Sequence, residues 1–145
     1  MTKVSELGIS NIGIKSLRRF NTMLNIIRKK SIRTMHFPLK ERRALIDFKT
    51  KLEERLGDQI KEIRLFGSKA RSDWRKGSDI DVLIILSRLA DKNQAKDIVY
   101  SLVLSICEKF GLYLSVKVFS EGEFGYYKSI PTLFVKNIMR ESILL

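Results

Sequence analysis

Apolar residues change repeatedly between helical and strand-like spacing along this chain, and this alternation constrains the fold more than any other feature. Between residues 39 and 56 they recur every three or four positions, up to Gly57, which predicts a helix. From residue 60 to 66 they alternate with charged residues, which is typical of a half-buried strand. Residues 79 to 86 predict a second strand, apolar on both faces beyond Asp81 and therefore central in its sheet.

The rest of the chain continues the alternation. Residues 91 to 110 carry a long helical stripe that ends at Gly111, and residues 112 to 119 alternate again as a third strand. We expect a short helix near 121 to 128 and a last one from Pro131, because proline is tolerated at the first helical position. The pattern predicts a mixed α/β (α+β) domain with a small mixed sheet and flanking helices.

Size and composition fit one such domain. The 145 residues, 44% of them hydrophobic, can cover a small sheet. One cysteine, Cys107, and one histidine, His36, exclude an intrachain disulfide and a Cys/His zinc site. No apolar run approaches the roughly 20 residues of a membrane span, and no secretory signal pattern is visible. We therefore expect a cytoplasmic protein.

Positive charge is concentrated at the N-terminus. The formal net charge is +12, and residues 1–37 hold eight lysines and arginines against one acid, Glu6. We interpret residues 1–37 as a basic extension and residues 38–145 as the folded domain. The extension could bind nucleic acid through phosphates, or it could be a solubilising or disordered tail. Met23 and Met35 leave open a natural start further along the chain.

Two carboxylates open the second predicted strand. Asp79 and Asp81 flank Ile80, and alternation along a strand places both side chains on one face. Their repulsion is relieved when a cation lies between them. Mg²⁺ accepts one or two carboxylates and takes further ligands from substrate phosphates, as in phosphoryl and nucleotidyl transfer.

A glycine and a serine follow the first predicted strand. Gly67 lets the backbone approach a phosphate closely, and Ser68 adds a hydroxyl donor. Cationic side chains come next in the sequence, and we expect them around the phosphates: Lys69, Arg71, Arg75 and Lys76. Taken singly, a Gly-Ser pair is usually a turn and an Asp-x-Asp pair is often a cap, so the joint pattern carries the prediction.

That joint pattern resembles the signature of the DNA polymerase β-like nucleotidyltransferase superfamily. The most similar branch is the minimal nucleotidyltransferases (MNT), and the resemblance runs from about residue 39 to the C-terminus. The matching stretches read Leu-Phe-Gly-Ser-Lys-Ala-Arg over residues 65–71 and Gly-Ser-Asp-Ile-Asp-Val-Leu-Ile over residues 77–84.

The resemblance implies a nucleotidyltransferase fold and a set of roles. Gly67 and Ser68 would bind the triphosphate together with Lys69, and Arg71 would steady the motif or the phosphates. Asp79 and Asp81 would be the catalytic, Mg²⁺-binding pair. Many MNT proteins are similar to antitoxins that transfer AMP from ATP to a HEPN-type toxin. The implied function is therefore transfer of a nucleotidyl group to a hydroxyl of a protein, with a HEPN toxin as partner.

One departure from the family pattern bears on catalysis. Active members commonly carry a third acid on the next strand, whereas residues 112–120 contain none, and Ser115 or Lys117 occupies that position. This suggests slow transfer, a base supplied by the partner, or a catalytically impaired protein that neutralises a partner by contact.

Three aromatic residues could also contribute to binding. Trp74 could stack on a base, but packing under the motif loop is the preferred interpretation. Tyr126 and Tyr127 could contact a partner or be modified, but the preferred interpretation is a core role on a helix face. Cys107 and His36 receive no chemical role.

Overall fold

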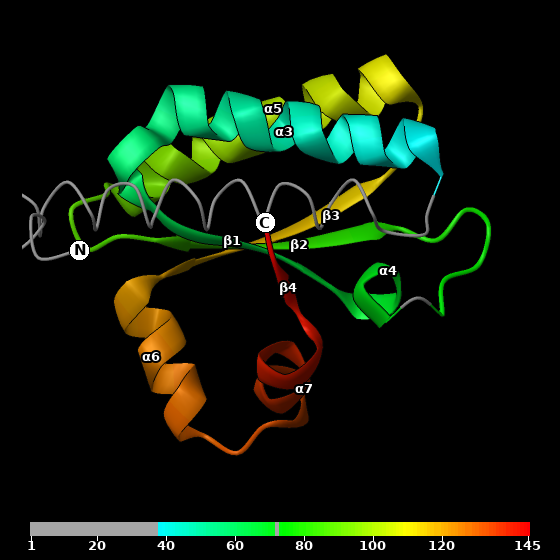
Figure 1. Ribbon diagram of the computed structural model, residues 1–145. Helices are drawn as coiled ribbons and strands as arrows, with labels where there is room; N and C mark the ends of the chain where they lie inside the picture. Colours follow the sequence, from blue (N-terminus) through cyan, green and yellow to red (C-terminus); the bar gives the residue numbers. More distant parts are fainter. Residues whose placement is uncertain (1–37, 72) are drawn as a thin grey trace, which may run out of the picture. The chain divides into compact units, whose positions relative to one another are not determined.

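A four-stranded mixed sheet forms the centre of this computed structural model, which describes residues 38–71 and 73–145 (Figure 1). The strand order is β3-β2-β1-β4; β2 is parallel to β3, and β1 is antiparallel to both of its neighbours. In chain order the elements are α3 (Leu39–Leu56), the 3₁₀-helix η1 (Gly57–Gln59), β1 (Ile60–Phe66), α4 (Gly67–Arg71), β2 (Ile80–Leu86), α5 (Lys92–Phe110), β3 (Leu114–Ser120), α6 (Glu121–Ser129), α7 (Leu133–Glu141) and β4 (Ile143–Leu144). The predicted mixed α/β fold is confirmed.

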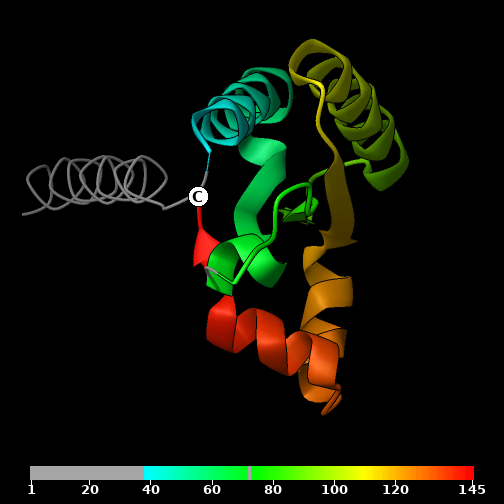
Figure 2. The same ribbon diagram turned by 90° about the vertical axis from the view of Figure 1, so that its right-hand side faces the viewer.

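Helices cover both faces of the sheet. Figures 1 and 2 show α3 and α5 on one face, and α6 and α7 on the other with α4 beside them. Because side chains alternate along a strand, β2 serves both layers. Leu83 and Ile85 belong to a buried cluster with Phe124 of α6 and Ile138 of α7, so Val82 and Ile84 face α3 and α5.

Local signals in the sequence explain the long helices. Asp91 caps α5, since its carboxylate accepts hydrogen bonds from the backbone N–H groups of Asn93 and Gln94. Gly111 ends the same helix in the left-handed conformation, with φ of 62°, which glycine adopts without steric cost. The predicted boundaries of α3, β1 and α5 agree with the structure within one residue.

Three predicted boundaries differ from the structure. Helix α7 begins at Leu133 rather than Pro131, because the Thr132 hydroxyl caps it by accepting from the Val135 N–H. Strand β2 begins at Ile80, so Asp79 lies just before it, and β3 begins two residues later than expected, at Leu114. The short strand β4 was not predicted at all.

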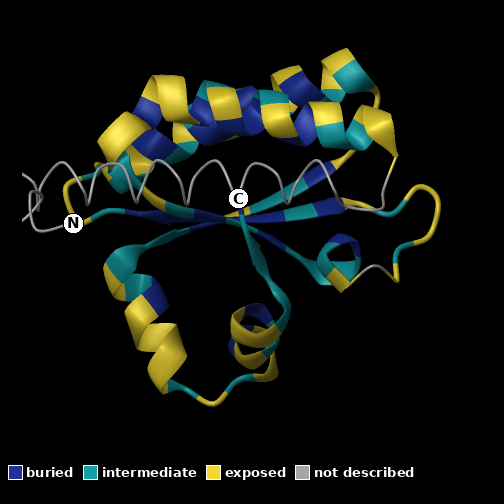
Figure 3. Ribbon diagram, viewed as in Figure 1, coloured by how far each residue is buried: buried dark blue, intermediate teal, exposed yellow. Residues whose placement is uncertain are grey.

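Burial follows the two-layer arrangement. Strand β2 is largely buried and β1 is mostly half-buried, whereas the outer sides of the helices are exposed (Figure 3). Helix α6 has one buried residue, Phe124, among its nine. Within the described part of the chain, the helices are too short or too polar to cross a membrane. The basic extension, with His36, lies outside the described residues.

Candidate active site

A close approach between Gly67 and Asp81 defines the candidate site. Asp81, the second residue of β2, pairs with Phe66 at the end of β1, and Gly67 follows directly as the first residue of α4. A Cβ atom built on Gly67 would stand 2.3 Å from Asp81 Oδ2, and the backbone there has φ of +71°. Only glycine satisfies both the conformation and the space at this turn. The structure therefore brings the two halves of the sequence motif into contact.

The two aspartates differ in environment. Asp79 is exposed in front of β2, whereas Asp81 is half-buried. Burial, and next the negative charge of Asp79, raise the pKa of Asp81; a hydrogen bond from Ser115 and the charges of Lys117 and Arg71 act in the opposite direction. Two neighbouring carboxylates, one of them partly desolvated, thus form a site that a cation would stabilise.

The expected Mg²⁺ fits this donor set. Both candidate ligands are carboxylates, the hard oxygen donors that Mg²⁺ prefers, and Gly67 leaves open the space that a side chain would take from Asp81. Within residues 38–71 and 73–145 no group of three or more Asp, Glu, His or Cys residues could hold a metal ion. A cation here would therefore depend on two carboxylates and on further oxygens from a substrate.

Strand register identifies the residue at the position of a third acid. Ser115 of β3 pairs with Asp81 of the parallel strand β2, so the two side chains share a face, while Lys117 pairs with Leu83 one pleat further on. Ser115 therefore stands where the family's third acid is expected.

The acids nearest in sequence are engaged elsewhere. Glu62 pairs with Arg64, with 2.7 Å between Oε2 and Nε. Glu121 forms ion pairs with Lys61 and Arg88, and Glu123 with Lys92. Glu62 lies opposite Ile85, four residues along β2 from Asp81, and Glu121 follows the far end of β3.

Lys69 has an environment that its sequence position did not indicate. Its side chain is fully buried, and its Nζ lies 2.6 Å from Oε2 of Glu41 in α3 and 4.2 Å from the centre of the Trp74 ring. Contact with a phosphate would require these contacts to break. Trp74 packs against this buried cation, in agreement with the packing interpretation.

Arg71 is held from two sides beside the site. Its Nε donates to Asp73 Oδ2 at 3.2 Å, and its Nη1 donates to Glu141 Oε2 at 3.4 Å. The hydrogen bond to Asp73, assisted by Glu141, raises the pKa of the arginine, which therefore stays charged. Glu141 is 70 positions away along the chain, and no local signal in the sequence indicates this pairing.

A cleft of about 200 Å³ opens next to the turn between β1 and α4. Gly67 and Arg71 line one side, and Phe134, Ile138 and Glu141 of α7 line the other. Ser68 follows in the first turn of α4 and is half-buried, while Arg75 and Lys76 are exposed in the loop before β2.

The two tyrosines and the cysteine named in the sequence analysis do not line this cleft. Tyr126 and Tyr127 are exposed on α6, so the expected core role is wrong, although the Tyr127 ring contacts Phe119. Cys107 is a half-buried free thiol on α5.

The chain is similar to known proteins in sequence and in structure. Residues 45–145 match the family described as nucleotidyltransferase domain. The chain is 32% identical over 107 residues to "Putative protein adenylyltransferase MJ0604" from Methanocaldococcus jannaschii, covering 71% of this chain and 95% of the relative. It is 27% identical to "Putative protein adenylyltransferase MJ0141" from the same organism, covering 63% and 85%.

Solved structures give weaker similarity. A chain from a crystal structure of a toxin–antitoxin with AMP-PNP has a TM-score of 0.43 at 18% identity, covering 68% of this chain and 69% of its own length. A nucleotidyltransferase structure from Sulfolobus solfataricus has a TM-score of 0.39 at 19% identity, covering 76% and 89%.

Proposed function

The chain belongs to the nucleotidyltransferase domain family, and we propose that it transfers the adenylyl group of ATP to a hydroxyl group of a protein, with Mg²⁺ held by Asp79 and Asp81. The approach of Gly67 to the Asp81 carboxylate carries this proposal, because a phosphate bound at Gly67 would lie next to a metal ion bound by Asp81. The description of two relatives as protein adenylyltransferases supports AMP as the group and a protein as the acceptor. A HEPN-type toxin as that acceptor stays a prediction from the sequence.

In the proposed reaction the acceptor oxygen bonds to the α-phosphorus of ATP, the bond from that phosphorus to its bridging oxygen breaks, and pyrophosphate leaves. Bound Mg²⁺ would neutralise the phosphate charge and polarise the phosphoryl oxygens. Gly67 and Ser68 would bind the triphosphate, and Arg71, fixed by Asp73 and Glu141, would add a positive charge at the cleft.

Another group than a third carboxylate must accept the proton of the acceptor hydroxyl. Ser115 stands at that position, and a serine hydroxyl is not a base at neutral pH. We therefore expect the proton to pass to solvent or to a basic group on the acceptor. A general base usually contributes about 10² to 10⁴ in rate, so transfer by this chain alone should be slow.

Ser115 also favours a second candidate function. A member of the family without the third acid could keep the fold and neutralise a partner by contact. In that case neutralisation survives the double substitution Asp79→Ala and Asp81→Ala, whereas an adenylyltransferase loses it.

The direct test uses ATP labelled on its α-phosphate, Mg²⁺, the full chain and the protein encoded by the adjacent open reading frame. Label should appear on the acceptor with the wild type and be lost with Asp79→Asn. Equal labelling with Asp79→Asn, or none with the wild type, would contradict the proposal.

A matched glycine pair sharpens the test. Gly67→Ala should abolish labelling, since its Cβ would collide with Asp81 Oδ2. Gly111→Ala carries a similar backbone strain, with φ of +62°, but its Cβ meets nothing within 4 Å. Gly111→Ala should therefore lower the free energy of unfolding by about 1 to 2 kcal/mol and leave AMP transfer unchanged.

A further inference from the structure

Exposed apolar side chains gather on α6, α7 and their connection, residues 124–140, which we name the α6–α7 surface. Five of the eleven large apolar side chains exposed among the described residues lie here. Leu133 is 74% exposed and Met139 49% exposed. The five are Tyr126, Tyr127, Leu133, Phe134 and Met139; Met139 lines the cavities described next, whereas Phe134 lines the cleft beside Gly67. A concentration of this kind typically marks an interaction site.

The charge of this surface has one sign. Residues 124–140 contain Lys128, Lys136 and Arg140 and no aspartate or glutamate. The Lys128 ammonium lies 5.3 Å from the centre of the Phe124 ring, and Arg140 pairs with Glu141 at 2.7 Å. The surface therefore combines apolar area with positive charge, which is complementary to an acidic partner.

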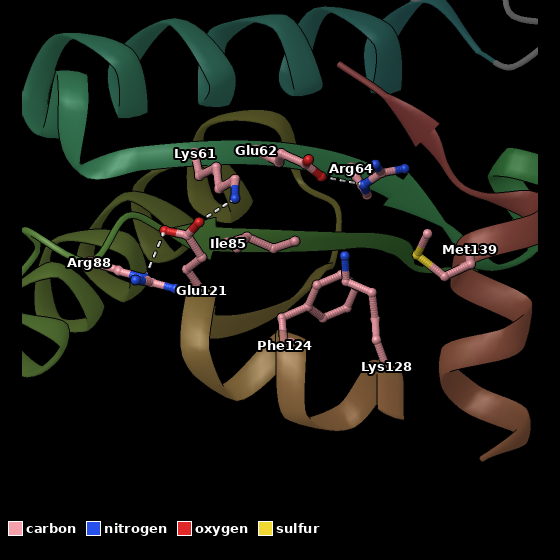
Figure 4. A pocket seen from close by; sticks show the side chains of 10 residues that line it. Lys61, Glu62, Arg64, Ile85, Arg88, Glu121, Phe124, Lys128 and Met139 are labelled. Carbon is pink, nitrogen blue, oxygen red and sulfur yellow. Dashed lines mark hydrogen bonds and ion pairs between the residues drawn. The ribbon is translucent and has the colours of Figure 1, made fainter. Parts of the chain in front are cut away.

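Two adjoining cavities give this surface its shape. One, of about 250 Å³, lies between α6, α7 and the strands, and Figure 4 shows Lys128 and Met139 reaching into it from the two helices. Its lining also includes two acids, Glu62 and Glu121, which form ion pairs with Arg64, Lys61 and Arg88. The other, of about 610 Å³, shares both of these residues. Its wall joins apolar side chains to cationic ones, namely Ile130, Pro131, Met139, Lys128, Lys136 and Arg140. Because Lys128 and Met139 line both cavities, we refer to the two together as the groove.

Helix α7 separates this groove from the candidate active site. Phe134, Ile138 and Glu141 line the cleft beside Gly67, whereas Lys136 and Met139 of the same helix line the groove. A helix with its side chains is about 10 Å across, so a segment in the groove lies about one helix width from the cleft.

We propose that the α6–α7 surface docks an acidic segment with apolar side chains on the protein that accepts the nucleotide. The identity of this partner as the acceptor rests on the proposed function. A protein fits better than a nucleic acid because aliphatic side chains such as Ile130, Leu133 and Met139 gain little from phosphates, while exposed aromatic residues, methionine and arginine are enriched at protein interfaces.

Fluorescence anisotropy with labelled peptides tests the docking. The probes are a peptide of glutamate and leucine, its counterparts with glutamine or lysine in place of glutamate, and a single-stranded RNA. The glutamate peptide should bind most tightly. The double substitution Lys128→Glu and Lys136→Glu should weaken it about tenfold, because it reverses two complementary charges.

A matched control changes the same charges on the opposite layer. Arg43→Glu with Arg55→Glu alters two exposed side chains of α3 and should leave peptide affinity nearly unchanged. All four side chains are exposed, so both double variants should melt like the wild type. Equal weakening by the two double variants would overturn the proposal, and so would a glutamine peptide that binds as well as the glutamate peptide.

RNA is the competing ligand class. Tighter binding of the RNA, with loss on Lys128→Glu and Lys136→Glu, would overturn the proposal in favour of a nucleic-acid surface. Asp79→Asn with Asp81→Asn should leave peptide binding intact. Docking without AMP transfer would contradict only the proposed function, and transfer without docking would contradict only the docking surface.

Discussion

The two faces of the central sheet differ in the polar groups and cavities that they carry. On the side of α3 and α5, the strand residues Val82 and Ile84 are completely buried among apolar side chains. On the side of α6 and α7, the same strand carries the half-buried Asp81, and the three cavities described above take none of their lining from α3 or α5.

This difference assigns stability mainly to the face of α3 and α5 and the candidate site to the opposite face. A closely packed layer gains most of its stability from burial without voids, whereas a layer with polar groups and cavities gains less. The face that carries the site therefore depends on the opposite face for its rigidity.

The largest expected effect compares neighbouring isoleucines of β2. Ile84→Ala should cost about 4 kcal/mol in the free energy of unfolding, because the Ile84 side chain is completely buried on the face toward α3 and α5. Ile85→Ala should cost about 2 kcal/mol, since Ile85 already borders a cavity on the other face. Urea denaturation measures both, and equal losses would contradict the distinction between the faces.

The next effect concerns the ion pair that joins the two layers. Lys69→Met should cost about 3 kcal/mol, because it leaves the Glu41 carboxylate, 13% exposed, without its partner. Lys51→Met removes an ammonium 3.4 Å from Asp47 on the outer side of α3 and should cost about 0.5 kcal/mol at most. Similar losses in the free energy of unfolding, measured in urea, would show that the Lys69–Glu41 ion pair does not stabilise the packing of α4 against α3.

A smaller effect is a gain of activity. Ser115→Asp restores an acid beside Asp81 and should raise AMP transfer by about a hundredfold, the lower end of what a general base usually contributes. Lys117→Asp places its carboxylate opposite Leu83 instead and should give no gain. Labelling rates decide between the positions, and a gain with Lys117→Asp alone would contradict the register.

The smallest effect is a pH dependence of stability. Burial, and next the charge of Asp79, raise the pKa of Asp81, so the folded state favours its protonated form. The charged form therefore costs stability as the pH rises above the ordinary value of 3.8. Asp81→Asn should melt slightly above the wild type at neutral pH, and the difference should vanish below that value.

Mg²⁺ provides the control for this prediction. If Asp79 and Asp81 bind the ion, added Mg²⁺ stabilises the wild type and reduces the difference at neutral pH. A variant that melts below the wild type at neutral pH would contradict the assigned repulsion.

The sequence predicted most of the fold because the signals for it are local. Helical periodicity, the Asp91 cap and Gly111 define α5, and alternation defines β1. Strand β4 is two residues long and exists through pairing with Arg64 and Leu65, which no local pattern shows. The start of α7 was misplaced because the Thr132 cap outweighs the preference of proline for a first turn.

The candidate site divides in the same way. Gly67 and Asp81 lie 14 positions apart in adjoining elements, so a motif could predict their proximity. The Lys69 pair spans 28 positions and the Arg71–Glu141 pair spans 70, and both depend on how helices pack. Their roles could therefore be assigned only from the structure.

The short distance along the chain between Gly67 and Asp81 bears on how such a protein can diverge. One continuous stretch, residues 67–81, contains the turn, the arginine and both carboxylates. Substitutions in residues 124–140 can then alter the outer surface of α6 and α7 without redirecting the backbone that holds the carboxylates. Related proteins with new partners should therefore differ most in this later segment and least in the earlier one.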